Sequence, residues 1–189
     1  EMCIRDRFKT TTNSDKIKSD YEENKSVKIA GRLMSRRIQG KASFAELQDH
    51  KGKIQLYFNR DEICAGDDKS MYNEVYKKLL DIGDIIGIDG SLFTTKVGEK
   101  TILVKKFSLL SKCLKPLPLP KTDSDGKIFD NFNDPESRYR QRYVDLVVNK
   151  SVKDTFIKRT LIIDQIRRFL NDKEYIEVET PILQPIPGG

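Results

Sequence analysis

The side chains best suited to chemistry lie on two neighbouring segments, at alternate positions that face away from the predicted core. In "ASFAELQD" we expect Ala45 and Leu47 to point inward, which leaves Phe44 facing outward. In "KIQLYF" the same alternation puts Gln55 and Tyr57 outside. An exposed ring beside an amide is typical of a site for single-stranded nucleic acid. The ring stacks on a base, and the amide reads the edge of that base.

Other candidates flank this face. Arg36 and Arg37, at the end of the preceding strand-like segment, could supply phosphate or base-edge contacts. Phe44 could instead pack under the N-terminal segment or against a neighbouring domain, and Tyr57 is better read as structural cover. Both interpretations of Phe44 stay open at this stage.

Few residues in this sequence could bind a metal ion or form a catalytic triad. His50 is the only histidine and lies in the turn "QDHKGK", which argues against a histidine metal site or a serine–histidine triad. Cys3, Cys64 and Cys113 lie far apart, so they predict neither a disulfide framework nor a zinc site, and they suit a reducing cytosol. We expect no metal site in this chain.

Composition indicates a soluble, cytoplasmic protein with no membrane partner. Charged residues make up 34% of the 189 residues and hydrophobic residues 37%. No apolar run approaches the length of a membrane span, and no secretory signal opens the chain. The formal charge of +6 favours phosphate-rich partners without requiring one.

The elements that would hold the outward face follow the order of a small barrel. Alternation predicts three strands over 27–38, 42–49 and 54–59, and two more over 84–93 and 100–110. A helix is expected between them, stopped near Gly83, with its apolar face formed by Met71, Val75, Leu79 and Ile82. This order favours a five-stranded OB-fold over SH3-like and other small β-domains. In an OB-fold the loop between the last two strands, which holds Glu99, borders the binding face.

The remaining chain predicts a second, helical part. Pro116, Pro118 and Pro120 indicate a stiff linker. The expected organisation is residues 1–25 as a polar, frayed lead-in with a short helix, 26–112 as the barrel, 113–135 as the linker, and 136–189 as the start of another domain. Asp134 is a predicted N-cap of a helix. The apolar stripe of that helix is Tyr139, Tyr143, Leu146 and Val147. A second helix over 151–172 has a buried side of Ile162, Ile163, Ile166, Phe169 and Leu170. "YIEVETPIL" is strand-like.

Several motifs in this order resemble one family. "AGRLMSRRIQGKASFAELQD", "GKIQLYF", "RYRQRYVDL" and "VETPILQPIPGG" are similar to bacterial-type lysyl-tRNA synthetases, which are class II enzymes. The resemblance covers the chain from about Phe8 onward. It implies an OB-fold anticodon-binding domain followed by the truncated start of an α+β catalytic domain.

The resemblance also implies roles for particular residues. Phe44 would stack on an anticodon base, and Arg36, Gln55 and Glu99 would read bases. "EYIEVETP" resembles motif 1, which would place Tyr175, Val178 and Pro181 in a dimer interface. Glu174 stands where the family usually has glycine, so we expect the turn there to be relaxed. Gly188 would lie beside the lysine substrate.

The resemblance implies a lysine–tRNA ligase that uses ATP and Mg²⁺, acts on tRNA-Lys and forms a homodimer. The residues that hold ATP and Mg²⁺ in this family would lie beyond Gly189. We therefore expect a fragment with no catalytic residue and no bound cofactor, inactive alone. Residues 1–7, "EMCIRDR", resemble a translated sequencing adapter. The alternatives are an aspartyl- or asparaginyl-tRNA synthetase fragment and a non-enzymatic OB-fold nucleic-acid-binding protein.

Overall fold

The computed structural model describes residues 8–118, 121–122, 128–129 and 132–181. These residues fall into two compact units, divided after Leu117. The expected boundary, after residue 112, lies close to this division.

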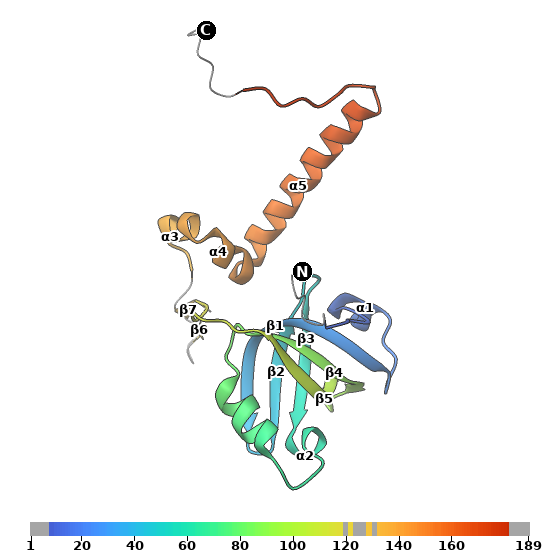
Figure 1. Ribbon diagram of the computed structural model, residues 1–189, viewed down its shortest axis with the longest axis vertical. Coiled ribbons are helices and arrows are strands. Elements are labelled where there is room, and N and C mark those ends of the chain that lie inside the picture. Colours follow the sequence, from blue (N-terminus) through green and yellow to red (C-terminus); the bar gives the residue numbers. More distant parts are fainter. Residues whose placement is uncertain (1–7, 119–120, 123–127, 130–131, 182–189) are drawn as a thin grey trace, which may run out of the picture. The chain divides into compact units, whose positions relative to one another are not determined.

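The first unit is a closed five-stranded barrel, as predicted (Figure 1). Its strands are β1 (Ser26–Gln39), β2 (Ala42–Gln48), β3 (Lys53–Asn59), β4 (Ile85–Thr94) and β5 (Lys100–Ser111). Around the barrel they run in the order β1-β2-β3-β5-β4. All neighbours are antiparallel except β3 and β5, which pair in parallel. Short helix α2 (Arg60–Ile63) follows β3.

The predicted inward faces of the first three strands are confirmed. Residues alternate between buried and partly exposed along β2 and β3, because successive side chains point to opposite sides of a strand. The buried set that fills the barrel from these strands is Val27, Ile29, Leu33, Ala45, Leu47, Ile54, Leu56 and Phe58. The outward position of Phe44 and Gln55 follows from this alternation.

The polar lead-in is not frayed, contrary to expectation. It contains helix α1 (Ser14–Ser19), whose N-cap Asn13 accepts a hydrogen bond from the Lys16 amide at 2.9 Å. Ile17 belongs to the barrel core and is only 2% exposed. The Asp49 carboxylate accepts hydrogen bonds from the Ser14 amide at 2.6 Å and the Ser14 hydroxyl at 2.7 Å. A buried apolar side chain and a carboxylate on the barrel therefore hold this polar segment in place.

The helix between β3 and β4 forms, but it buries a different face from the one predicted. It is a π-helix, η1 (Met71–Leu79), in which Met71 and Leu79 are exposed and Tyr72 and Tyr76 are fully buried. The Tyr76 ring stacks on Phe58 with 4.1 Å between ring centroids. The prediction failed because it placed the apolar face by the 3.6-residue repeat of an α-helix, which a π-helix does not follow. Here the rings fill the end of the core while their hydroxyls find partners.

Burial raises the pKa of Tyr76 to about 12, although its hydrogen bond with Ser43 and the charge of Arg36 oppose the shift. The Tyr76 hydroxyl lies 2.6 Å from the Ser43 hydroxyl. Tyr76 is therefore a neutral core residue, with its polar tip satisfied inside the barrel.

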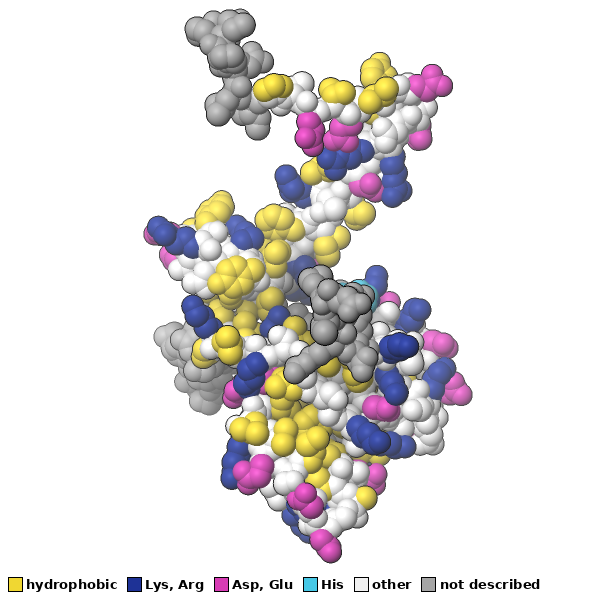
Figure 2. Space-filling model, viewed as in Figure 1, with side chains coloured by type: hydrophobic (Ala, Val, Ile, Leu, Met, Phe, Trp, Pro, Cys, Tyr) yellow, Lys and Arg dark blue, Asp and Glu magenta, His cyan; other side chains and the backbone are white. Residues whose placement is uncertain are grey.

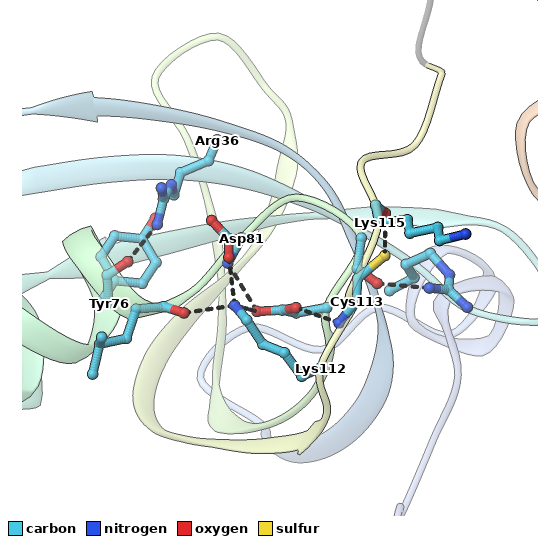
Figure 3. Close-up of polar contacts among 10 residues, drawn as sticks. Arg36, Tyr76, Asp81, Lys112, Cys113 and Lys115 are labelled. Carbon is cyan, nitrogen blue, oxygen red and sulfur yellow. Dashed lines mark hydrogen bonds and ion pairs between the residues drawn. The ribbon is translucent and has the colours of Figure 1, made fainter.

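A buried carboxylate joins the turn before β4 to the residues after β5 (Figure 3). Asp84 is 0% exposed and accepts hydrogen bonds from the amides of Asp81 and Cys113, both at 2.8 Å. The Lys112 ammonium contacts Asp84 at 2.8 Å and Asp81 at 2.6 Å. Gly83, with φ +102°, turns the chain here, and a side chain on it would meet the Cys113 sulfur at 2.6 Å. This network holds the residues that follow β5 against the turn that precedes β4.

The stability of the barrel should depend on pH through Asp84. Burial acts to raise the pKa of this carboxyl, but two amide hydrogen bonds and Lys112 hold it below its ordinary 3.8. A group with a lowered folded-state pKa stabilises the fold above its unfolded pKa, and that contribution disappears as pH falls through the folded value. We expect Asp84→Asn to lower the free energy of unfolding at pH 7 and to flatten its decline below about pH 4. Denaturant titrations at pH 7 and in steps below pH 4 measure both effects. An unchanged pH slope in the variant would contradict this role.

The second unit begins with a two-stranded pair, β6 (Lys121–Thr122) and β7 (Ile128–Phe129), and continues with helices. The single helix predicted after the linker is two helices, α3 (Pro135–Arg140) and α4 (Arg142–Val148), which break at Gln141. Asp134 caps α3 as predicted, accepting from the Ser137 amide at 2.7 Å. The second predicted helix is confirmed as α5 (Lys150–Asn171).

Asp145 is the partner of two of the three arginines in "RYRQRYVDL". This carboxylate is fully buried and is bonded by the guanidiniums of Arg138, at 3.2 Å, and Arg142. Asn149 donates to it from the start of α5 at 2.7 Å. Burial would raise the pKa of Asp145, but these donors lower it, so the carboxylate stays charged. One buried charge thus joins α3, α4 and α5.

The apolar stripes of these helices are not buried in the described unit. Tyr139 and Tyr143 are 78% and 68% exposed, and most of the stripe of α5 lies on the surface (Figure 2). The residues predicted as the buried side of α5 are exposed, except Ile163, which is half-buried; among the described residues, a partly enclosed surface forms only at the C-terminal end of the helix. There, Ile163, Ile166 and Leu170 line a hollow with Tyr175 and Ile176.

The chain after α5 does not form the predicted strand, because residues 175–181 pair with no described strand. Glu174 instead ends the helix in a left-handed conformation, with φ 65°. Its amide donates to the Asn171 carbonyl at 2.9 Å, and the Tyr175 amide donates to the Leu170 carbonyl at 3.1 Å. This pair of bonds is a Schellman motif, in which glycine usually occupies the left-handed position. The expected relaxed turn is therefore wrong: the tight turn is kept, with glutamate in it.

Replacing Glu174 by glycine should stabilise this turn. A side chain in the left-handed region costs about 1 kcal/mol, which glycine avoids. We expect Glu174→Gly to slow hydrogen exchange of the Tyr175 amide by about fivefold, because 1.4 kcal/mol corresponds to a factor of ten. Exchange of amides in the barrel serves as the internal control and should not change. Faster exchange at Tyr175 would show that glutamate makes a stabilising contact there.

Candidate nucleic-acid interface

Three of the predicted site residues meet in one hollow on the outside of the barrel. Phe44 from β2, Gln55 from β3 and Glu99 from the loop before β5 all line it, and its volume is about 160 Å³. Strand pairing brings them together, because Gln55 lies opposite Glu46 on β2 and opposite Thr101 on β5. The other lining residues are Lys18, Ser35, Arg37, Ala45, Glu46, Lys53 and Ile54.

Phe44 is the aromatic member of this hollow, and it lies outside the barrel core. Its ring packs against Tyr57, directly across the strand pair, with 5.0 Å between centroids and a 45° angle between planes. Tyr57 in turn meets Phe93 edge-on at 5.7 Å. Tyr57 thus supports Phe44 from one side, consistent with its interpretation as structural cover. A half-buried ring with a supported edge is a suitable platform for a nucleobase.

Arg36 does not line the hollow, and Arg37 does. The guanidinium of Arg36 donates to the Tyr76 carbonyl and lies over the Tyr76 ring, 5.5 Å from its centroid (Figure 3). A β-bulge between Leu33 and Ser35 explains the difference. One extra residue in a strand reverses which side chains face outward beyond it. Arg36 therefore shares a face with Ala45, its buried partner, whereas Arg37 shares a face with Phe44.

The floor of the hollow carries a cross-strand ion pair. The Lys53 ammonium contacts the Glu46 carboxylate at 2.7 Å, beside Gln55. Glu99 sits at the end of a tight turn, where its amide donates to the Thr95 hydroxyl at 3.0 Å and the Thr95 amide donates to the Glu99 carbonyl at 3.0 Å. The turn fixes the backbone of Glu99 and leaves its carboxylate exposed to a ligand.

Sequence reasoning missed the contribution of the lead-in and of the ion pair. Lys18, on α1, lies 26 positions before Phe44 in the chain, and no local pattern connects the two. Glu46 and Lys53 carry a signal that was available, because they are outward residues of opposite charge at diagonal positions across a hairpin. The β-bulge has no such signal, since β1 reads as one alternating run.

The residues predicted for a dimer interface lie on the surface of the chain after α5. Tyr175 and Val178 are 65% and 72% exposed, and Pro181 is also exposed. Gly188 lies outside the described residues. Across the described ranges, no three acidic, histidine or cysteine side chains converge where a metal ion could be held. None of the described helices is long and apolar enough to cross a bilayer.

Comparisons with known proteins define the class. Residues 27–110 match the family described as "OB-fold nucleic acid binding domain", and residues 134–189 match "tRNA synthetases class II (D, K and N)". The barrel with its outer hollow is thus an anticodon-type OB-fold domain joined to class II aminoacyl-tRNA synthetase sequence.

Relatives narrow this class to one family. The chain is 67% identical over 184 residues to the lysine–tRNA ligase of Christiangramia forsetii, and 55% identical over 181 residues to that of Porphyromonas gingivalis. It is 48% identical over 185 residues to that of Clostridium novyi. These alignments cover 93–97% of the chain but only 31–34% of each relative, so the chain spans about a third of their length. The chain belongs to the lysyl-tRNA synthetase family, and the aspartyl, asparaginyl and stand-alone alternatives are not favoured.

The two neighbouring arginines should behave differently in stability measurements. Arg36→Ala removes a charged hydrogen bond and a cation–π contact at the barrel end, so we expect a loss of about 2 kcal/mol in the free energy of unfolding. Arg37→Ala removes an exposed side chain and should change it by less than about 0.5 kcal/mol. Chemical denaturation of both variants measures the difference. Equal losses would mean that the bulge does not separate the two side chains as described.

Proposed function

We propose that the barrel binds the anticodon of tRNA-Lys through the hollow that holds Phe44, Gln55 and Glu99. The observation that carries this proposal is the meeting, on one outer face, of an aromatic ring, an amide and a carboxylate from three separate segments. A ring stacks on any base, whereas at one edge of a base an amide donates and accepts hydrogen bonds and a carboxylate accepts them. This combination suits a single-stranded base that has been turned out of its stack.

The charges around the hollow support a nucleic-acid ligand. Arg37 and Lys18 lie at it, and Lys53 lies there paired with Glu46. Cations near a stacked base neutralise backbone phosphates, which supplies most of the affinity without reading sequence. The proposed division of labour is therefore that the basic side chains hold the strand and that Phe44, Gln55 and Glu99 select the base.

For the whole protein we propose ATP-dependent ligation of lysine to tRNA-Lys in the cytoplasm, by a homodimer. The lysine carboxylate would attack the α-phosphorus of ATP and release pyrophosphate. A ribose hydroxyl at the tRNA 3′ end would then attack the carbonyl carbon of the adenylate, which forms the lysyl ester and releases AMP. Mg²⁺ would stabilise charge on the phosphates. This chain's part in that reaction is to hold the anticodon. Tyr175, Val178 and Pro181 would contribute to the dimer interface, and Gly188 would line the lysine pocket.

Anticodon binding can be tested with two variants of the hollow. Phe44→Ala should weaken binding of a lysine anticodon stem-loop by about 1–3 kcal/mol, the usual contribution of one base–aromatic stack. Because Phe44 lies outside the core, the denaturant midpoint should barely change. Gln55→Ala should weaken binding and also reduce discrimination between anticodon bases, since an amide reads an edge and a ring does not. Fluorescence anisotropy with lysine and aspartate anticodon stem-loops measures both.

Two outcomes would contradict this function. If the unaltered chain binds both stem-loops equally, the hollow does not select the lysine anticodon. If Phe44→Ala unfolds early yet binds RNA normally once folded, Phe44 is a packing residue and the RNA site lies elsewhere.

A further inference from the structure

We propose that helix α1 is a wall of the RNA site and that Lys18 binds a backbone phosphate of the anticodon loop. This inference rests on the proposed anticodon binding and adds a contact from outside the barrel strands. Lys18 lines the same hollow as Phe44, Gln55 and Glu99, although it belongs to the segment that precedes β1. The ligand chemistry is a phosphodiester next to a stacked base.

The start of α1 is held rigidly enough to present a side chain. Asp49 accepts four hydrogen bonds, from the Ser14 amide and hydroxyl and from the amides of Lys51 and Gly52, at 2.6–2.8 Å. Ile17, next to Lys18, is buried in the barrel core. Figure 1 shows the helix against the barrel. One carboxylate thus fixes both the β2–β3 turn and the start of α1, so Asp49 is a positioning residue.

The end of α1 is fastened to the two strands that flank the Glu99 loop. The Lys100 ammonium donates to the Lys18 carbonyl at 2.6 Å and lies over the Tyr21 ring, 5.2 Å from its centroid. The Tyr21 hydroxyl and the Thr94 hydroxyl are 2.8 Å apart. Because Thr94 ends β4 and Lys100 begins β5, these contacts set Lys18 beside the loop that carries Glu99.

The charge of Lys18 is available to a ligand. Its side chain is exposed and makes no ion pair within the described part of the chain, whereas Lys53 in the same hollow is neutralised by Glu46. Arg37 is the other lining cation without a described carboxylate partner. Lys18 comes from the lead-in and Arg37 from β1, so the two cations reach the hollow from different elements. A base stacked on Phe44 would have its phosphates within reach of such side chains, which is the arrangement of single-strand binding grooves.

The salt dependence of RNA binding tests this contact. Each phosphate contact in a single-stranded complex contributes about 0.7 to the slope of log K against log salt concentration. We expect Lys18→Ala to reduce that slope by about 0.7 for the lysine anticodon stem-loop, and to weaken binding roughly fourfold at about 0.15 M salt. Preference for the lysine over the aspartate stem-loop should stay as in the unaltered chain. Lys18→Arg should restore the slope.

Lys16→Ala is the matched control, since Lys16 is an exposed lysine on the same helix that does not line the hollow. We expect the slope to stay unchanged in this variant. An equal decrease in both lysine variants would overturn the proposal, because it would show a general field and no contact. Unchanged binding in Lys18→Ala would also overturn it.

Failure of this inference can be told from failure of the anticodon function. If the unaltered chain prefers the lysine stem-loop and Phe44→Ala weakens it, the function stands, and the lysine variants alone decide the role of Lys18. If the unaltered chain shows no preference, the function itself has failed.

The positioning role of Asp49 has its own test. Asp49→Ala should lower the salt slope as Lys18→Ala does, and the double variant should show no further decrease, because residues that act through one contact are not additive. Additive decreases would show that Asp49 does not position Lys18. Ser14→Ala, which removes only the hydroxyl bond, provides the same comparison if Asp49→Ala does not fold.

Discussion

The parallel pairing of β3 with β5 is the contact on which the rest of the first unit depends. It closes the barrel, because β5 pairs with β4 along one side and with β3 along the other, which leaves the sheet no free edge. The same pairing sets Gln55 opposite Thr101, two residues after Glu99. Closure of the barrel and assembly of the hollow are therefore one event.

Closure requires the chain between β3 and β4 to cover the end of the barrel. Helix η1 does this with the ring of Tyr76, which contacts Phe58 and Phe107, and with the ring of Tyr72, which stacks on Tyr76. Arg36, turned inward by the bulge, then bonds the helix from β1. The bulge thus has two consequences: it turns Arg36 toward η1, to which Arg36 hydrogen-bonds, and it leaves Arg37 on the outer face. A single extra residue affects both the packing of the core and the set of side chains at the proposed RNA site.

Much of the fold and part of the site could be predicted from the sequence. Strict alternation in β2 and β3 was sufficient to place Phe44 and Gln55 outward, because it depends only on backbone geometry. It was not predictable that Arg37, and not Arg36, lines the hollow. The β-bulge reverses the alternation of inward and outward side chains, and no turn residue marks its position in the sequence. The exposed stripe of η1 was misassigned because a π-helix does not follow the repeat of an α-helix. The position of Lys18 at the hollow was not predictable either, because it depends on contacts with β2, β4 and β5, which are distant from Lys18 in the sequence.

The proposed site combines attraction for RNA in general with rejection of strands that carry the wrong base. The surplus of positive charge draws any RNA toward the chain, and Lys18 and Arg37 would hold its phosphates without regard to sequence. Glu99 opposes this, because a carboxylate repels phosphate and is stabilised only where a base edge donates a hydrogen bond to it. The carboxylate therefore lowers the affinity for wrong strands more than for the right one. In this arrangement the cations at the rim of the hollow supply the affinity. The polar groups beside a base stacked on Phe44 select that base.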